Sequence, residues 1–415
     1  MTSEQLHRYS HFPHHCGLQW DLPQNMARHF IIAVAVICLC NVRHASSVDY
    51  VIGEYTDTSN TGNVNHLIIN QNNGKIFVGA VNAIYQFSEN LVLEKTVTTG
   101  PIEDSPNCRP ERPCGCDDWA SGQNCDSFIK RMTDSVNKAL VIDYDGQRLI
   151  TCSNLRQGHC EKRDLSNISQ TDPSIYRPIV NYDLTSPVVM YIAPGLPTEY
   201  GEHSKALYVA ATYSTIGDYA ALVPSISSRN MDTFDRMYHD VLNGDTALLL
   251  RDSPEFRIIY KTGFSSGSFS YFLAVQPEMS TGNTHATRNV TKIMRVCQDD
   301  KHFRSYVEMP LKCTHNGVDY DILQDADMIR PGSHLAQSLG LAHLDQSHND
   351  DVIFAVFTRH LPPQSDEAPQ SAMCVYDMRT VKLKFTSAIQ KCFQGVGNTG
   401  PAHFKPSAPC MNLVS

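Results

Sequence analysis

The residues of this chain whose types and spacing could support catalysis or ligand binding lie in two glycine-containing motifs and one cysteine cluster. Gly263, Ser265 and Gly267 match the G-x-S-x-G pattern, in which a serine nucleophile sits on a sharp turn between a strand and a helix. Here Ser268–Val275 continues as an apolar run typical of a strand. The pattern therefore predicts a glycine-rich turn between two strands, and a secreted hydrolase using Ser265 is the alternative.

The remaining motifs favour structural roles. The segment Gly395–Gly400 matches G-x-G-x-x-G, but no strand-to-helix unit surrounds it, so phosphate binding is not expected. Cys108, Cys114, Cys116 and Cys125 could hold zinc or form disulfides, and a secreted chain favours disulfides. The histidines include no H-E-x-x-H pair. The sequence thus predicts no catalytic residue, no cofactor and no metal site, and we expect a protein that is not an enzyme.

A repeated β-hairpin supplies the framework for these residues. Asn65–Ser88 contains two or three short strands, with Asn73-Gly74 as the tight turn. The same pattern returns at Asn137–Arg163, with Asp145-Gly146 at the turn. A hairpin this small cannot bury its own apolar face, so each copy needs neighbouring strands. Further apolar runs, rich in β-branched and aromatic residues, follow at Leu207–Ala211, Ser270–Val275 and Val352–Phe357.

The spacing of these runs predicts an all-β propeller. They recur at intervals of roughly 60 to 80 residues, longer than the simplest propeller blades, as radially repeated sheets with long insertions would produce. A stack of sandwich domains is the alternative. Immunoglobulin-type sandwiches would show a Cys…Trp…Cys spacing, however, and the tryptophans of this chain are Trp20 and Trp119.

The N-terminal segment indicates secretion. Residues 1–25 are polar and His-rich, and we expect an unstructured extension there. Residues 26–47 have the features of a signal peptide: Arg28, an apolar run from Phe30 to Cys40 that is too short to span a bilayer, and small residues at Ala45-Ser46-Ser47. A buried helix of a globular domain is the alternative. We expect the mature protein to begin near Val48, with no later segment apolar enough to cross a membrane.

Cysteine usage and charge agree with an extracellular protein. Eleven cysteines follow the signal peptide, and an odd number leaves one without an internal partner. Asn167-Ile-Ser169 and Asn289-Val-Thr291 are glycosylation sequons. The net charge of −9 argues against a general nucleic-acid surface, which needs a basic face.

A set of short segments, spread in order over nearly all of Tyr50–Cys410, carries a family resemblance. The segments are Asn65–Leu67, Gly79–Asn82, Thr99–Pro101, Asp104-Ser105, Asn137–Asp143, Cys152–Cys160, Ser228–Asn230, Gly263–Gly267, Tyr271–Leu273, Gln276-Pro277, Val296-Cys297, Ser305–Glu308, Ser371–Cys374 and Cys392–Gly395. In these segments the chain resembles the sema domain at the N-terminus of plexin ectodomains, and scatter-factor receptors match them less well. The plexin subclass is not fixed, although Leu93–Gly100 and Cys160–Arg163 favour the B-type.

This resemblance implies a sema-type seven-bladed β-propeller that binds semaphorins through one face. It also implies three disulfides, which are Cys152–Cys160, Cys313–Cys374 and Cys392–Cys410. In family members the cysteine matching Cys297 pairs with one beyond the last of these. That partner would lie past Ser415, so we expect Cys297 to be unpaired here.

Two departures from the family pattern lead to further expectations. The loop after Cys108 carries four cysteines where two are usual, which leaves three connectivities open. About five blades are visible, so we expect 48–415 to be a sema domain truncated before the propeller closes. An unclosed propeller exposes an edge strand and part of its core, and such a chain would fold poorly alone or need a partner.

The resemblance implies a non-enzymatic binding module, the semaphorin-recognising extracellular domain of a plexin-type cell-surface receptor in guidance signalling. Semaphorin is the expected partner, with co-receptors possible. A secreted soluble decoy that binds semaphorin without signalling is the alternative. The expected location is the secretory pathway, then the cell surface as part of a longer receptor, or the extracellular space if the chain ends at Ser415.

Overall fold

The computed structural model describes residues 55–56, 63–108, 129–173, 175, 177–240, 244–248, 256–278, 288–341, 351–361 and 370–395. All of them belong to one unit of the chain, Gly53–Ser415. The signal-peptide prediction for residues 26–47 and the extension before it fall outside the described residues.

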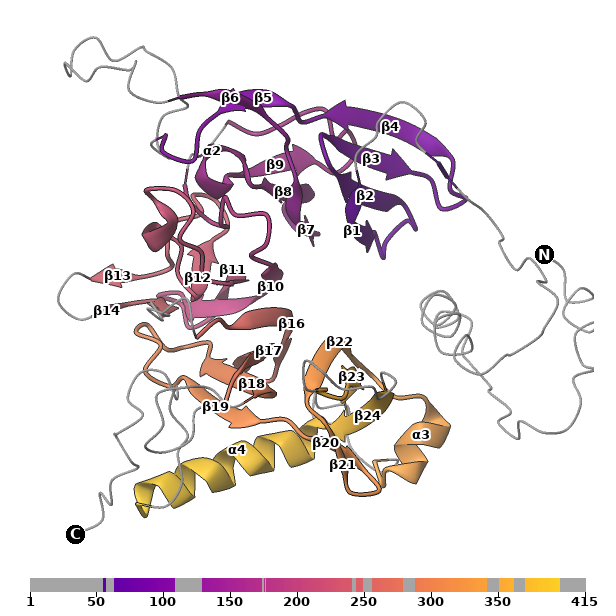
Figure 1. The fold of residues 1–415 in the computed structure, drawn as a ribbon, viewed down its shortest axis with the longest axis vertical. Helices are drawn as coiled ribbons and strands as arrows, with labels where there is room; N and C mark the ends of the chain where they lie inside the picture. The colour runs from indigo at the N-terminus through magenta and orange to yellow at the C-terminus, as the bar shows by residue number, and fades with distance from the viewer. Residues whose placement is uncertain are drawn as a thin grey trace, which may run out of the picture. The chain divides into compact units, whose positions relative to one another are not determined.

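Five antiparallel sheets, here numbered 1 to 5 in chain order, dominate the described residues (Figure 1). Sheet 1 contains β1 (Val64–Ile69), β2 (Ile76–Ala80), β3 (Ala83–Phe87) and β4 (Leu93–Thr98). Sheet 2 contains β7 (Asn137–Asp143), β8 (Arg148–Ser153) and β9 (Cys160–Asp164). Sheet 3 contains β10 (Val188–Pro197), β11 (His203–Ala211), β12 (Ile226–Asn230) and β15 (Ala247–Leu248).

Sheet 4 contains β16 (Ile259–Ser266), β17 (Phe269–Pro277), β18 (Asn289–Cys297) and β19 (Val307–Pro310). Sheet 5 contains β22 (Ile322–Ile329), β23 (Val352–Thr358) and β24 (Ser371–Asp377). Three short hairpins accompany the sheets, namely β5–β6 (Ile102–Asp104, Arg131–Thr133), β13–β14 (His239–Asp240, Gly244–Asp245) and β20–β21 (Cys313–His315, Val318–Tyr320).

In the described part of the chain, four short or medium helical segments interrupt the strands. They are α2 (Leu155–Gly158), a 3-10 turn (Ala220–Leu222), α3 (Ser333–Ser338) and α4 (Met378–Phe393). The sequence analysis did not anticipate α4. Asp377 caps its N-terminus by accepting a hydrogen bond from the Thr380 amide at 2.8 Å, which satisfies one of the donors that every helix start leaves open.

The first predicted hairpin is confirmed, and the second folds with a different turn residue. Between β1 and β2, Gly74 adopts φ +70° and its amide donates to the Asn70 carbonyl at 2.8 Å. Between β7 and β8 the positive φ belongs to Gln147, not to Gly146. Gly146 is required there for space, since a Cβ would lie 2.2 Å from a carboxylate oxygen of Asp143.

Successive sheets pack face to face, and their first strands are neighbours. β1 contacts β7, β7 contacts β10, β10 contacts β16, and β16 contacts β22. β11 and β17, the second strands of sheets 3 and 4, are buried on both faces over most of their length, which explains why their apolar runs are continuous instead of alternating. β23 in sheet 5 buries one face, while Val356 on the other face is exposed. A stack of separate sandwich domains is therefore wrong, and the repeated-sheet propeller architecture is confirmed.

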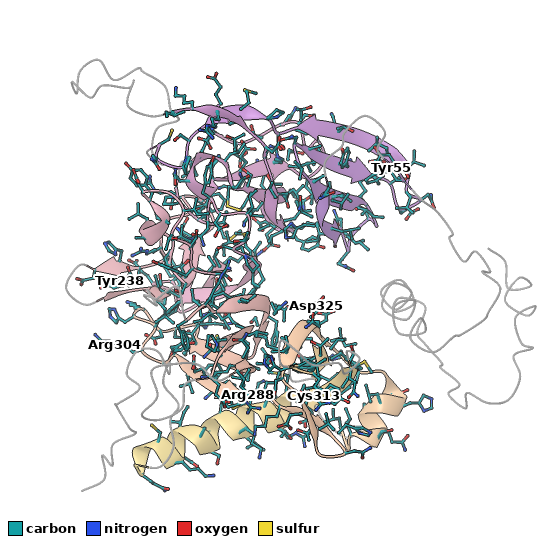
Figure 2. All side chains as sticks on the ribbon, viewed as in Figure 1. Tyr55, Tyr238, Arg288, Arg304, Cys313 and Asp325 are labelled. Atoms are coloured by element: carbon teal, nitrogen blue, oxygen red, sulfur yellow. A yellow bond between two sulfur atoms is a disulfide. The ribbon has the colours of Figure 1, made fainter. Side chains whose placement is uncertain are left out.

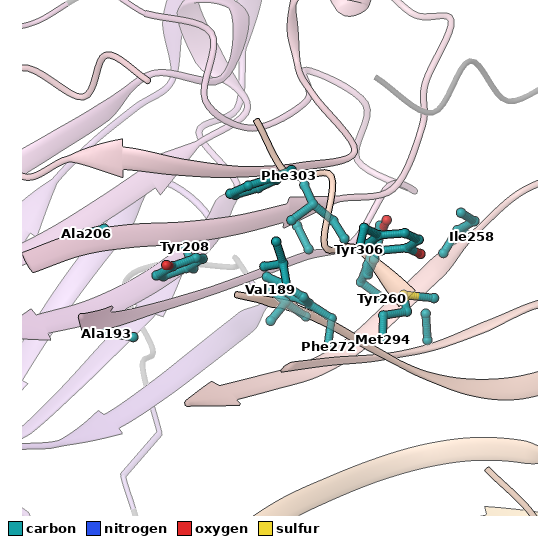
Figure 3. Packing of buried hydrophobic residues seen from close by; sticks show 14 of the residues in the cluster. Val189, Ala193, Ala206, Tyr208, Ile258, Tyr260, Phe272, Met294, Phe303 and Tyr306 are labelled. Carbon is teal, nitrogen blue, oxygen red and sulfur yellow. The ribbon is translucent and has the colours of Figure 1, made fainter. Parts of the chain in front are cut away.

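A separate apolar cluster fills each gap between neighbouring sheets. The cluster between sheets 3 and 4 is rich in aromatic residues, among them Tyr208, Tyr260, Phe272 and Phe303 (Figure 3). The Tyr191 ring stacks on Tyr208 with centroids 5.6 Å apart. Burying each such side chain contributes about 1.5–3 kcal/mol to the stability of the fold. The clusters therefore hold the sheets at fixed positions, and the sheets position the loops between their strands.

Candidate functional site

Ser265 lies in a strand–turn–strand unit. It is near the end of β16, Gly267 makes the turn with φ +59°, and β17 begins at Phe269. Its hydroxyl accepts a hydrogen bond from the side-chain amide of Gln298 at 2.8 Å. A nucleophile elbow needs a helix after the serine and a histidine as base, and neither accompanies Ser265 among the described residues. The predicted glycine turn between strands is confirmed.

Gly395 also has a structural role. It follows α4 with φ +79°, and its amide donates to the Cys392 carbonyl at 2.9 Å. This is the left-handed glycine that commonly ends a helix. A helix therefore precedes the G-x-G-x-x-G segment instead of a strand, while residues 396–400 lie outside the described part of the chain.

The cysteine pairs implied by the resemblance are joined where both partners are described. Cys152 bonds Cys160, and Cys313 bonds Cys374 (Cys313 is labelled in Figure 2). Cys297, at the end of β18, is a half-exposed free thiol. Cys108 and Cys392 are disulfide-bonded. The partner expected for Cys392, Cys410, lies outside the described residues, as do Cys114, Cys116 and Cys125.

The Cys152–Cys160 disulfide closes a turn with an uncommon backbone. Arg156, Gln157 and Gly158 all have positive φ, at 51°, 63° and 80°. Left-handed geometry costs a non-glycine residue roughly 1–2 kcal/mol, so Arg156 and Gln157 must be held by their surroundings. The disulfide joins the two ends of the turn, and it favours the folded turn by lowering the conformational entropy of the unfolded chain.

Contacts from the β5 segment supply the rest of the restraint. The Asp104 carboxylate accepts the Arg156 amide at 2.7 Å, and the Gln157 side chain donates to the Ser105 carbonyl at 3.2 Å. Burial raises the pKa of Asp104, although the bond from the Arg156 amide acts in the opposite direction. The turn is therefore fixed from two sides.

Beside this turn, sheets 1 and 2 line a partly open cavity of about 160 Å³ with both polar and apolar walls. Sheet 1 contributes Thr98 at the end of β4, and sheet 2 contributes Arg156 from the turn and three side chains from β9 and its approach. These three are His159, Glu161 and Arg163. The sequence analysis did not find this cavity; the one available signal was the pair of cysteines that brackets the turn.

Arg163 is the central charged group of the cavity. Its side chain is only 6% exposed and forms an ion pair with Glu161. It also donates from Nε to the Thr151 hydroxyl at 3.3 Å and from Nη1 to the Ile168 carbonyl at 3.1 Å. Nδ1 of His159 lies 3.1 Å from the Ile175 carbonyl. Burial lowers the pKa of His159, with the neighbouring Glu161 partly opposing the shift, so this imidazole is neutral at pH 7.

Both predicted sequons begin with an accessible asparagine. Asn289 is exposed at the first residue of β18. Asn167 is half-buried, and its side-chain oxygen accepts a hydrogen bond from Lys95 Nζ at 2.6 Å. That contact uses the oxygen and leaves the nitrogen, which is the atom that carries a glycan.

In the described residues, no group of three or more His, Cys, Asp or Glu side chains is arranged to hold a metal ion. None of the helices in the same residues is long and apolar enough to cross a membrane.

Comparisons with known proteins agree on one family. The Sema domain family model matches residues 323–413. Plexin-A4 of Danio rerio is 33% identical over 364 residues, which cover 82% of this chain and 18% of the relative. Human Plexin-A2 is 32% identical over 353 residues, covering 80% and 17%. The chain thus spans less than a fifth of the length of these relatives.

A solved structure of the full extracellular region of Plexin A4 superposes with a TM-score of 0.68 at 29% identity, covering 86% of this chain and 38% of that one. The sequence similarity and the structural similarity each cover more than four fifths of this chain. This chain belongs to the plexin family, and its repeated sheets are those of a sema domain.

Proposed function

We propose that this chain is the semaphorin-recognising extracellular part of a plexin-type guidance receptor and that it has no enzymatic activity. Family membership supports this function, because the similarity to plexins covers more than four fifths of the chain. That similarity is the observation on which the proposal depends. The sheets form a rigid framework that presents loops to protein partners.

Binding to immobilised semaphorins tests the proposal. Purified chain should bind at least one semaphorin saturably and should not bind scatter factor, which serves as the unrelated control ligand. Ser265→Ala should bind semaphorin as the wild type does and lose no hydrolytic activity, since Ser265 lies near the end of β16, before a turn between two strands. Failure to bind any member of a complete semaphorin panel would contradict the proposal, and hydrolysis lost in Ser265→Ala would favour the hydrolase.

The receptor role and the decoy role predict different native transcripts downstream of the codon for Ser415. An open frame that runs on to further cysteines and a membrane span would support the receptor. A stop codon at this position would support a secreted decoy. Semaphorin binding alone is compatible with both roles.

We also propose secretion with cleavage of residues 26–47 and modification of both sequons. Chain secreted from cultured cells should begin near Val48 on N-terminal sequencing. Asn289→Gln and Asn167→Gln should each remove one glycan by mass, and the double variant should match the enzymatically deglycosylated protein. Peptide mapping under non-reducing conditions should find Cys392 joined to Cys410.

A further inference from the structure

The cavity between sheets 1 and 2 differs in charge from the protein as a whole. The chain has a net charge of −9. The cavity wall carries two guanidinium groups, Arg156 and Arg163, and one carboxylate, Glu161, which forms an ion pair with Arg163. A local excess of positive charge on an acidic protein attracts anions into the site where it lies.

Arg163 retains hydrogen-bonding capacity at this wall. A guanidinium has five N–H donors, and three are used by Thr151, Ile168 and Glu161. Within the described residues no further hydrogen bond of Arg163 is found. Arg229 occupies the equivalent position in sheet 3. Its Nη2 group donates to the backbone carbonyl of Pro178 at 3.4 Å, whereas that of Arg163 donates to the Glu161 carboxylate.

The size of the cavity limits what it can hold. At about 160 Å³ it has room for about five water molecules. Sites for cofactors and drug-sized ligands are larger, on the order of 300–1,000 Å³. A single small acidic group is the occupant that fits both the volume and the charge.

We propose that this cavity binds a carboxylate, held by Arg163 at the inner wall and by Arg156 from the left-handed turn. Guanidinium groups match carboxylates in geometry and form charge-assisted hydrogen bonds with them. Hydroxyl groups of the wall, such as that of Ser153, supply further donors. The carboxylate comes either from a small free acid or from an acidic side chain of a protein ligand.

Ligand-observed NMR with glutarate tests the proposal, with the uncharged diamide of glutarate as control. The wild-type chain should bind glutarate and not the diamide. Arg156→Gln should weaken glutarate binding about tenfold, the loss expected for about 1.4 kcal/mol. Thr98→Trp, at an exposed position on the rim, should block entry. Arg330→Gln removes an exposed charge on sheet 5 and should leave binding unchanged.

Thermal midpoints of all variants should stay near that of the wild type, because Arg156 is half-exposed and Thr98 is exposed. No glutarate binding by the wild type would overturn the proposal. Equal binding of glutarate and its diamide would also overturn it, as would unchanged binding in both cavity variants.

Competition with semaphorin distinguishes the two sources of the carboxylate, and this step alone rests on the proposed function. If the source is an acidic side chain of the semaphorin, glutarate should lower semaphorin affinity and Arg156→Gln should weaken both ligands. If the source is a free acid, glutarate should bind without changing semaphorin affinity. If the wild-type chain bound no semaphorin of the panel, the proposed function would be refuted, while the glutarate result would still hold.

Discussion

Arg163 and Arg229 form the same hydrogen bond in neighbouring sheets. Each lies in the third strand of its sheet and donates from Nη1 to the backbone carbonyl five residues later, Ile168 at 3.1 Å and Phe234 at 3.0 Å. Arg295, in the third strand of sheet 4, follows Arg229 in the sequence by the same number of residues as Arg229 follows Arg163. Its guanidinium lies over two aromatic rings. The same position of the repeat therefore has a different role in each sheet: Arg163 lines a cavity, Arg229 anchors a loop and Arg295 contacts a helix.

The loop-anchor role predicts that Arg229→Lys destabilises the fold. Arg229 is buried, and its three hydrogen bonds go to neutral acceptors on Ser227, Phe234 and Pro178. Burial lowers its pKa to about 10. A lysine ammonium cannot reach all three acceptors, so we expect a loss of about 2–4 kcal/mol. The shift in the urea midpoint measures it.

Arg330→Lys is the matched control for that experiment, because the Arg330 side chain is mostly exposed and should tolerate the change. Equal midpoints for the two variants would show that the three hydrogen bonds of Arg229 contribute nothing.

Glycine substitutions separate backbone strain from steric clash. Gly158 and Gly201 both have φ +80°. A Cβ at Gly158 would lie 1.6 Å from the Val180 carbonyl oxygen, whereas nothing lies within 4 Å of one at Gly201. Gly201→Ala should therefore cost only the left-handed backbone, about 1–2 kcal/mol. Gly158→Ala should cost clearly more, or prevent secretion. Similar thermal midpoints for the two variants would mean that the turn at Gly158 moves freely away from Val180.

Much of this fold is predictable because its signals are local. Asn73-Gly74 specifies a turn by itself, and β11 and β17 are apolar because both of their faces are covered over most of their length. The turn at Arg156 and Gln157 carries no such signal, since neither residue favours a positive φ. The cavity depends on how two sheets meet, which no single segment encodes. α4 had a signal, the capping Asp377 followed by apolar Met378, Val381 and Phe385 at helical spacing, which the repeat pattern obscured.

Lys138 predicts a stability that depends on alkaline pH. It is buried, and its Nζ donates to the Asp183 and Ser186 carbonyls at 2.6 and 2.7 Å. Burial lowers its pKa from 10.5 to about 8, with Asp183 opposing and Arg257 reinforcing the shift. Between these two values the unfolded chain binds more protons than the folded chain, so the contribution of Lys138 to stability rises with pH.

The rise should reach about 3 kcal/mol across that window, at 1.36 kcal/mol per pH unit. Lys138→Met lacks the titrating group, so the difference in urea midpoint between wild type and variant should grow from pH 8 to pH 10.5 in favour of the wild type. A difference that stays constant over this range would show that Lys138 has an ordinary pKa in the folded chain.

The helix contact at Arg295 predicts how α4 is held on sheet 4. The guanidinium carbon lies 4.3 Å from the ring centroid of Phe269 and 4.5 Å from that of Phe385, and the Phe385 ring also meets Tyr271 edge to face. Phe385→Leu removes one side of this arrangement. We expect a loss of about 2 kcal/mol, from the smaller buried side chain and the lost cation–π contact.

Leu383→Ala is the control on the same helix, because Leu383 is 63% exposed and its truncation should change stability by at most about 0.5 kcal/mol. Hydrogen exchange of the α4 amides gives the local measurement. These amides should exchange faster in Phe385→Leu while those of β11 in sheet 3 stay protected, since the contact joins the helix to sheet 4 alone. Unchanged exchange along α4 would mean that Met378 and Val381 hold the helix without Phe385, and that the aromatic contact with Arg295 is incidental.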